Sequence, residues 1–203
     1  MSEIQEASYA LGHQIGISLE SQYGTALDTS AIQDGVADGL AGQSKLDDEQ
    51  KLAAQKRLME IVNEAKAASE QAQKAAGIAF MKSNGEREGV ITTPSGLQYE
   101  VMAEGDQSGA HPKPADTVVT HYHGTLIDGT VFDSSVDRGQ PASFRLDGVI
   151  KGWTEALQLM RPGDKYRLVL PPELAYGSQS AGPKIAPYST LIFEVELLDI
   201  EGD

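Results

Sequence analysis

The spacing of apolar residues changes near residue 90, and this change limits the folds open to the 203-residue chain. Before residue 90, apolar residues recur every three or four positions among Ala, Gln and Glu, as in amphipathic helices. After it, Pro, Gly, aromatic and β-branched residues become frequent and the period falls to two, as in strands. We therefore expect an α+β protein with a helical module at residues 1–46, a long connecting helix at 47–89 and a sheet domain at 90–203.

Three helices are expected in the first part of the chain. The first carries one apolar stripe, made by Ile4, Ala7, Leu11, Ile15 and Leu19. The second is predicted to start at Ser30, where a Ser-x-x-Gln pattern forms a capping box. The third is predicted to start near Asp47, with Gln50 in the matching position, and to continue to about Ser83. Its second half offers mainly alanines, which bury little area, so we expect a solvated strut there.

Pairs of glycines four residues apart occur in the first two predicted helices. These pairs are Gly12 with Gly16 and Gly35 with Gly39. Glycine lowers helix propensity, but on an apolar face it lets two helix backbones approach closely. The neighbouring helix could belong to the same chain or to a second copy. Two short helices and half of a third bury too little surface to be stable alone, so we expect a homodimer through the N-terminal helices.

The segment after residue 90 is predicted to form an antiparallel sheet packed on one short helix. Strands are expected at residues 90–92, 97–101, 117–126, 142–145, 166–170 and 190–200. The turn Thr93-Pro94-Ser95-Gly96 joins the first two strands, with Pro at its second position and Gly at its fourth. Helical spacing of four apolar residues indicates the short helix, at Ile150, Trp153, Leu157 and Met160.

The composition excludes several classes of partner and chemistry. A formal net charge of −14 repels phosphate backbones and anionic lipid, so neither nucleic acid nor a membrane surface is an expected partner. The absence of cysteine excludes disulfides, thiolate zinc sites and cysteine nucleophiles. The first residues have no basic segment followed by an apolar one, and no apolar run reaches bilayer length. We therefore expect a cytoplasmic location.

Four sequence blocks in the second half resemble, in order and spacing, the FKBP-type peptidyl-prolyl cis-trans isomerases. They are VVTHYHGTLIDGTVFDSS (118–135), VIKGWTEAL (149–157), LPPELAYG (170–177) and TLIFEVELLDI (190–200). The resemblance implies an FKBP-like twisted antiparallel sheet wrapped on one short helix. The helical first half is similar to the dimerisation module of the macrophage-infectivity-potentiator-like bacterial branch of this family.

The resemblance also implies an apolar, aromatic-lined pocket that accepts a proline ring. The residues it assigns to catalysis are Tyr122, Phe132, Asp133, Trp153, Tyr176 and Phe193. The residues it assigns to substrate binding are Arg138, Phe144, Val149, Ile150 and Ile185. Trp153 would form the pocket floor. The backbone N–H of Ile150 and the hydroxyl of Tyr176 would bond carbonyl groups of the ligand.

The chemistry of proline isomerisation is consistent with this set of residues. Rotating an Xaa-Pro bond costs about 18–20 kcal/mol because the amide loses its resonance. No bond to another atom is made or broken, so no nucleophile, proton-transfer base or cofactor is required. A dry pocket that fits the twisted imide better than the planar one accelerates the rotation. Because the uncatalysed reaction is slow enough to limit folding, we expect an isomerase acting on proline-containing polypeptides and folding intermediates.

Other interpretations of the same residues are open. Trp153 could be core packing on an amphipathic helix, and Asp133 could form a turn with the serines that follow it. His121 and His123 alternate with Tyr122 and so face away from it. Two histidines without a third ligand are weak evidence for metal, and we expect no metal site.

Three residues depart from the family pattern. Ala142, Ala181 and Lys184 stand where relatives often carry larger aromatic or aliphatic side chains. We expect these changes to alter the preference for the residue before proline and to weaken binding of macrolide inhibitors. The alternative function is that of a dimeric chaperone-like protein that binds unfolded clients, with catalysis secondary.

Overall fold

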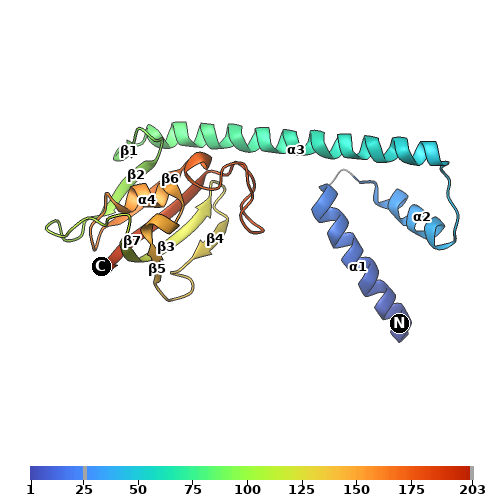
Figure 1. Ribbon diagram of the computed structural model, residues 1–203, viewed down its shortest axis with the longest axis horizontal. Coiled ribbons are helices and arrows are strands. Elements are labelled where there is room, and N and C mark those ends of the chain that lie inside the picture. The colour runs from blue at the N-terminus through green and yellow to red at the C-terminus, as the bar shows by residue number, and fades with distance from the viewer. Residues whose placement is uncertain (25–26, 202–203) are drawn as a thin grey trace. The chain divides into compact units, whose positions relative to one another are not determined.

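The computed structural model describes residues 1–24 and 27–201, and the chain divides into two compact units, Met1–Ser69 and Glu70–Asp203 (Figure 1). The division falls within the long helix α3 (Asp48–Gly85) and not at its ends. The second half of this helix therefore belongs with the sheet. The predicted three-part division at residues 46 and 89 stays a prediction.

The N-terminal unit contains α1 (Glu3–Tyr23), α2 (Thr29–Leu40) and the first half of α3. The predicted start of α3 is confirmed, because Asp47 and Gln50 accept reciprocal backbone hydrogen bonds of 2.8 and 3.0 Å. The predicted cap of α2 is wrong. Asp28 caps this helix by accepting from the Ala31 N–H at 2.9 Å, and Ser30 lies inside the first turn. Aspartate and serine are equally good N-caps, and the aspartate comes first along the chain.

The second unit is built on an antiparallel sheet, which confirms the α+β fold. Its seven described strands follow the order β1-β2-β6-β7-β3-β4, with β5 paired to β3. They are β1 (Val90–Thr92), β2 (Gln98–Ala103), β3 (Thr117–Leu126), β4 (Val131–Ser134), β5 (Ala142–Arg145), β6 (Lys165–Leu170) and β7 (Leu191–Glu201). Strand β4 was not predicted. It follows a tight turn in which Gly129 has a φ of 86° and the Leu126 N–H donates to the Thr130 carbonyl at 2.9 Å.

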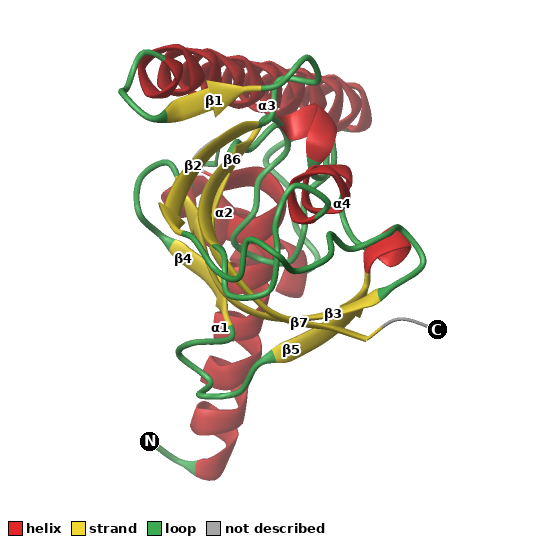
Figure 2. Cartoon of the chain, turned by 90° about the vertical axis from the view of Figure 1, so that its left-hand side faces the viewer, coloured by secondary structure: helices red, strands yellow, loops and turns green. Residues whose placement is uncertain are grey.

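The sheet curves around the short helix α4 (Lys151–Leu157), and the main core lies between them (Figure 2). Trp153, Ala156 and Leu157 of α4 are buried against apolar residues of the sheet, including Leu168, Leu170, Leu191, Val195 and Leu197. A Cβ on Gly152 would lie 2.4 Å from the Leu170 side chain, so glycine lets α4 approach β6. Two short 3-10 helices, η2 (Leu146–Gly148) and η3 (Pro172–Leu174), flank this core.

The alanines in the second half of α3 are exposed, as expected for a solvated strut, but this half also packs on the sheet around its two buried residues, Gly77 and Asn84, which the alanine pattern did not predict. The buried side chain of Asn84 donates to Gln98 Oε1 at 2.8 Å, and Gln98 Nε2 donates to the Met81 carbonyl at 2.8 Å. Arg87 and Arg167 also donate to Asn84 Oδ1, at 3.0 and 2.8 Å. This helix is docked by polar side chains, which an apolar periodicity does not register. No helix in the described part of the chain is long and apolar enough to cross a membrane.

Candidate active site

A pocket of about 660 Å³ opens beside α4. Ten of the eleven residues predicted for the site line it, namely Tyr122, Phe132, Asp133, Phe144, Val149, Ile150, Trp153, Tyr176, Ile185 and Phe193. They come from β3, β4, β5, α4, β7 and the loops beside α4 and η3. Arg138 does not line the pocket but bonds to two residues that do. Their individual roles in catalysis and binding stay predictions.

The floor of the pocket is a cluster of aromatic rings around Trp153. Three rings meet the indole nearly at right angles: Tyr122 at a centroid distance of 5.2 Å, Phe193 at 5.3 Å and Phe144 at 5.6 Å. Phe132 meets Phe193 edge to face at 5.4 Å. Such edge-to-face contacts are favourable and fix each ring in one orientation. Trp153 is only 4% exposed, so it is both a core residue and part of the pocket lining.

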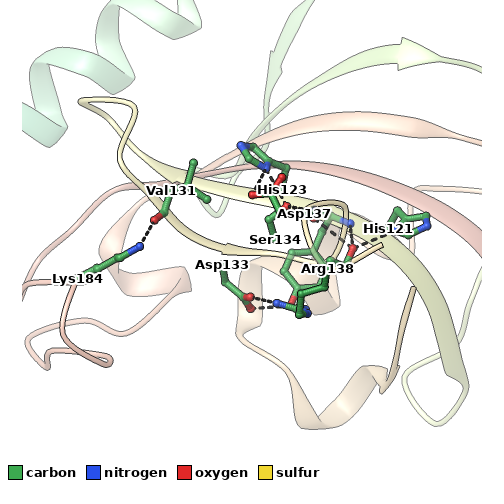
Figure 3. Close-up of polar contacts among 10 residues, drawn as sticks. His121, His123, Val131, Asp133, Ser134, Asp137, Arg138 and Lys184 are labelled. Carbon is green, nitrogen blue, oxygen red and sulfur yellow. Dashed lines mark hydrogen bonds and ion pairs between the residues drawn. The ribbon is translucent and has the colours of Figure 1, made fainter. Parts of the chain in front are cut away.

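The rim of the pocket carries a hydrogen-bonded group of three polar side chains. The Tyr122 hydroxyl donates to Asp133 Oδ2 at 2.5 Å, and Arg138 Nη2 donates to the Tyr122 oxygen at 2.9 Å. Arg138 Nη1 forms an ion pair with Asp133 Oδ1 (Figure 3). Tyr122 and Asp133 lie on neighbouring strands, because Gly124 of β3 pairs with Asp133 of β4.

These contacts set the charge of each group. Burial raises the pKa of the Asp133 carboxyl, but the hydrogen bonds from Tyr122 and Arg138 outweigh burial and hold that pKa below its ordinary value. Burial and the bond to Asp133 raise the pKa of the Tyr122 phenol. Near neutral pH, Asp133 is therefore an anion and Tyr122 a neutral donor. The rim is an ion pair bridged by a phenol, and its net charge is zero.

Ser135 holds the backbone of β3 beside the pocket. The Tyr122 N–H donates to Ser135 Oγ at 2.8 Å, and the Ser135 N–H donates to the Tyr122 carbonyl at 3.0 Å. His121 Nδ1 lies 3.1 Å from Ser135 Oγ, and His123 Nδ1 lies 2.9 Å from Ser134 Oγ (Figure 3). Neither histidine lines the pocket. The described residues contain no cluster of His, Cys, Asp and Glu suited to a metal ion.

Gly124 is a site residue that the sequence reasoning missed. A Cβ at this position would lie 2.7 Å from the Phe132 ring and 3.0 Å from the Phe193 ring. The absence of a side chain therefore lets these two rings meet over β3. The available signal was a glycine in the interior of a predicted strand, which often marks a close approach.

The pocket wall after η3 carries two of the three departures from the family pattern. Ala181 and Lys184 line the pocket, and Lys184 Nζ donates to the Val131 carbonyl of β4 at 2.6 Å (Figure 3). The third departure, Ala142, does not line the pocket but packs against the core. It faces Thr120 of β3 across the strand pair.

The fold and the aromatic pocket define a class of protein, and two family comparisons agree with it. Residues 108–198 match the FKBP-type peptidyl-prolyl cis-trans isomerase family. Residues 4–101 match the domain amino terminal to FKBP-type peptidyl-prolyl isomerase. The chain belongs to the FKBP-type peptidyl-prolyl cis-trans isomerases and is an enzyme of that class.

Individual relatives match nearly the whole chain. The FKBP-type 22 kDa peptidyl-prolyl cis-trans isomerase of Escherichia coli (strain K12) is 46% identical, over 96% of this chain and 94% of its own length. The outer membrane protein MIP of Legionella longbeachae is 39% identical, over 96% of this chain and 84% of its own. The crystal structure of FkpA from Escherichia coli aligns with a TM-score of 0.76 at 40% identity, covering 98% of this chain and 97% of FkpA.

Proposed function

We propose that the chain rotates Xaa-Pro bonds in polypeptides by binding the twisted imide in the aromatic pocket without forming a covalent bond. The observation that carries this mechanism is the floor at Trp153, which three other rings meet edge to face. The twisted imide has lost its resonance and is less polar than the planar form. Apolar walls therefore favour the transition state over the ground state, which is the condition for catalysis.

Donors at the pocket edge complete the proposed mechanism. The N–H of Ile150 has no acceptor among the described residues and would hold a substrate carbonyl. Tyr176 is 42% exposed and would bond a second carbonyl through its hydroxyl. Asp133, fixed by Tyr122 and Arg138, would face the carbonyl of the rotating bond. The Ile150 N–H and Asp133 are held in place and would stabilise the rotated geometry without reorganising during the reaction, whereas the Tyr176 hydroxyl would hold the peptide in both geometries.

A pocket ligand provides the test of this assignment. A macrolide that carries a proline-like ring should compete with a short Xaa-Pro peptide and slow its isomerisation in proportion to occupancy. Trp153 is the sole tryptophan of the chain, so its fluorescence should change with the same midpoint as the inhibition. Inhibition without a fluorescence change would place the active site elsewhere. The Ala181 and Lys184 wall leads us to expect weaker binding than in relatives with larger residues there.

We also propose that the N-terminal unit forms a homodimer. In the described residues, α1 and α2 bury none of their side chains. They form a groove of about 950 Å³, whose apolar lining residues include Ile15, Leu19, Ile32, Val36 and Leu40. An apolar face of this kind on a unit too small to be stable alone favours a second copy as its cover.

Sedimentation tests the dimer. The 21.7 kDa chain should sediment at twice its own mass. Val36→Asp adds a charge to the groove and should give a monomer, whereas Ile78→Asp adds the same charge to an exposed residue outside the N-terminal unit and should not. A monomeric wild-type chain would refute the proposal.

The cytoplasmic location stays a prediction, and cell fractionation tests it.

Chaperone-like client binding can be distinguished from isomerisation because only client binding should depend on the N-terminal unit. If client binding were the main function, the Val36→Asp monomer would lose refolding of a protein client and keep isomerisation of a short peptide. Two pockets on one dimer raise the effective concentration of binding sites on an unfolded client. Equal client refolding by monomer and dimer would exclude this contribution.

A further inference from the structure

One wall of the active-site pocket is a loop whose two ends are tied together. The loop lies between η3 and β7 and contributes Tyr176 and residues 181–185 to the pocket lining. At its base the Tyr188 N–H donates to the Gly177 carbonyl at 2.8 Å. Within the loop the Ala181 N–H donates to the Ile185 carbonyl at 2.9 Å. Gly177, the residue next to Tyr176, is held on one side by its own N–H, which donates to the Pro172 carbonyl at 2.8 Å, and on the other by Tyr188. The position of Tyr176 therefore depends in part on Tyr188.

Tyr188 is held in an unfavourable backbone conformation. Its φ of 61° is the only positive φ of a non-glycine residue in the part of the chain that the structure describes. Side chains with a Cβ rarely adopt this left-handed region, and they do so where surrounding contacts impose it. A residue of this kind at the base of a pocket wall requires an external contact to keep it in place.

Helix α3 supplies that contact, on three consecutive residues of the loop. Lys74 Nζ lies 3.7 Å from the centroid of the Tyr188 ring. Gln73 Nε2 donates to Ser189 Oγ at 3.3 Å. A Cβ on Gly77 would lie 2.5 Å from Thr190 Oγ1, so the helix backbone reaches the loop at this point. A cation over an aromatic face is attracted by the electron density of the ring.

We propose that Lys74 is a positioning residue for the isomerase: its ammonium holds the ring of Tyr188, and Tyr188 holds Gly177 and thereby the pocket residue Tyr176. Lys74 is outside the pocket lining. Tyr176 lies at the exposed edge of the pocket, away from the Asp133 rim that would face the rotating bond, so we assign it to holding the peptide in its planar and twisted forms alike. Loss of Lys74 should therefore weaken substrate binding and leave the rate of the bound complex unchanged.

Three full-length variants test this role. Lys74→Met keeps the length of the side chain but removes the cation. It should raise KM for an Xaa-Pro peptide about three-fold at unchanged kcat, the range expected for one cation–π contact. Lys74→Arg restores the cation and should restore KM. Lys82→Met removes an exposed lysine from the same helix and should leave KM unchanged.

A second measurement is independent of activity, which matters because the inference rests on the proposed isomerase site. Hydrogen exchange of the Tyr188 amide should become about three-fold faster in Lys74→Met and stay normal in Lys74→Arg and Lys82→Met. An inactive wild-type chain would refute the proposed function, but the exchange rate of the Tyr188 amide would still show whether Lys74 holds Tyr188. Unchanged KM and unchanged Tyr188 exchange in Lys74→Met would overturn the positioning role, even if the melting temperature fell. Equal effects of Lys82→Met would overturn it as well.

Discussion

The hydroxyl of Tyr122 donates a 2.5 Å hydrogen bond to Oδ2 of Asp133, and this bond joins the aromatic floor of the pocket to its charged rim. Tyr122 contacts Trp153 through its ring and Asp133 through its hydroxyl. Arg138 closes the group by bonding both Tyr122 and Asp133. The orientation of one side chain therefore links the apolar and polar parts of the site.

Removing the carboxylate should leave the Tyr122 hydroxyl without an acceptor and Arg138 with the Tyr122 oxygen as its one acceptor in this group. We expect Asp133→Leu to lower kcat/KM for an Xaa-Pro peptide about ten-fold, a modest loss for charged hydrogen bonds because Asp133 is partly exposed. Tyr122→Phe removes the same bond from the other side. The double variant should therefore be little worse than Asp133→Leu alone in a peptide assay. Fully additive losses would show that the two residues act separately.

Catalysis should depend on the packing of Phe132 against Phe193, so adding or removing side-chain volume at this contact should lower kcat/KM. Phe132→Ala should lower kcat/KM on the order of thirty-fold, since it removes one apolar wall of the pocket. Gly124→Ala should also lower it, because the new methyl group would occupy the space of the Phe132 ring. The matched control is Gly39→Ala, outside the pocket, whose Cβ would meet no atom within 4 Å. Wild-type activity in Gly124→Ala would contradict the packing described here.

The dependence of catalysis on pH should be flat across the neutral range. The pKa of Asp133 is lowered in the folded protein, so its carboxylate stays charged at every pH above the ordinary pKa of 3.8. The bonds from Tyr122 and Arg138 are therefore lost only when the pH falls through the lower, folded-state pKa. The raised pKa of Tyr122 keeps the phenol neutral until pH exceeds its ordinary value of 10.0. We expect constant kcat/KM from about pH 5 to about pH 9 in a protease-free peptide assay. A bell-shaped profile centred in that range would indicate acid–base chemistry.

Docking of α3 should contribute to the stability of the sheet unit. Gln98→Ala removes the partner of the buried Asn84 side chain and should lower the free energy of unfolding by about 2 kcal/mol. A fragment of residues 70–203 should therefore unfold at higher denaturant concentration than one of residues 90–203. Both predictions are checked by denaturant titration. Equal midpoints for the two fragments would show that the second half of α3 adds no stability.

The sequence predicted the fold class, most strand positions and ten lining residues because these depend on local period and on ordered sequence blocks. Three features could not be predicted in this way. Strand β4 reads Val-Phe-Asp-Ser, two apolar residues followed by two polar ones, so it shows no period of two. The docking of α3 uses the polar side chains of Asn84 and Gln98 and the close approach of Gly77 to Thr190. None of these contributes to a hydrophobic pattern. Strain at Tyr188 is a backbone property imposed by distant residues, and no local pattern reports it.

The most direct test of the account is the relaxation rate of an Xaa-Pro peptide after a solvent jump that disturbs its cis–trans equilibrium. With purified full-length protein, we predict a rate that rises linearly with enzyme concentration and returns to the spontaneous value when the pocket is filled by a macrolide. Relaxation at the spontaneous rate at every enzyme concentration and for every peptide tested would contradict the claim that this aromatic pocket lowers the barrier to imide rotation.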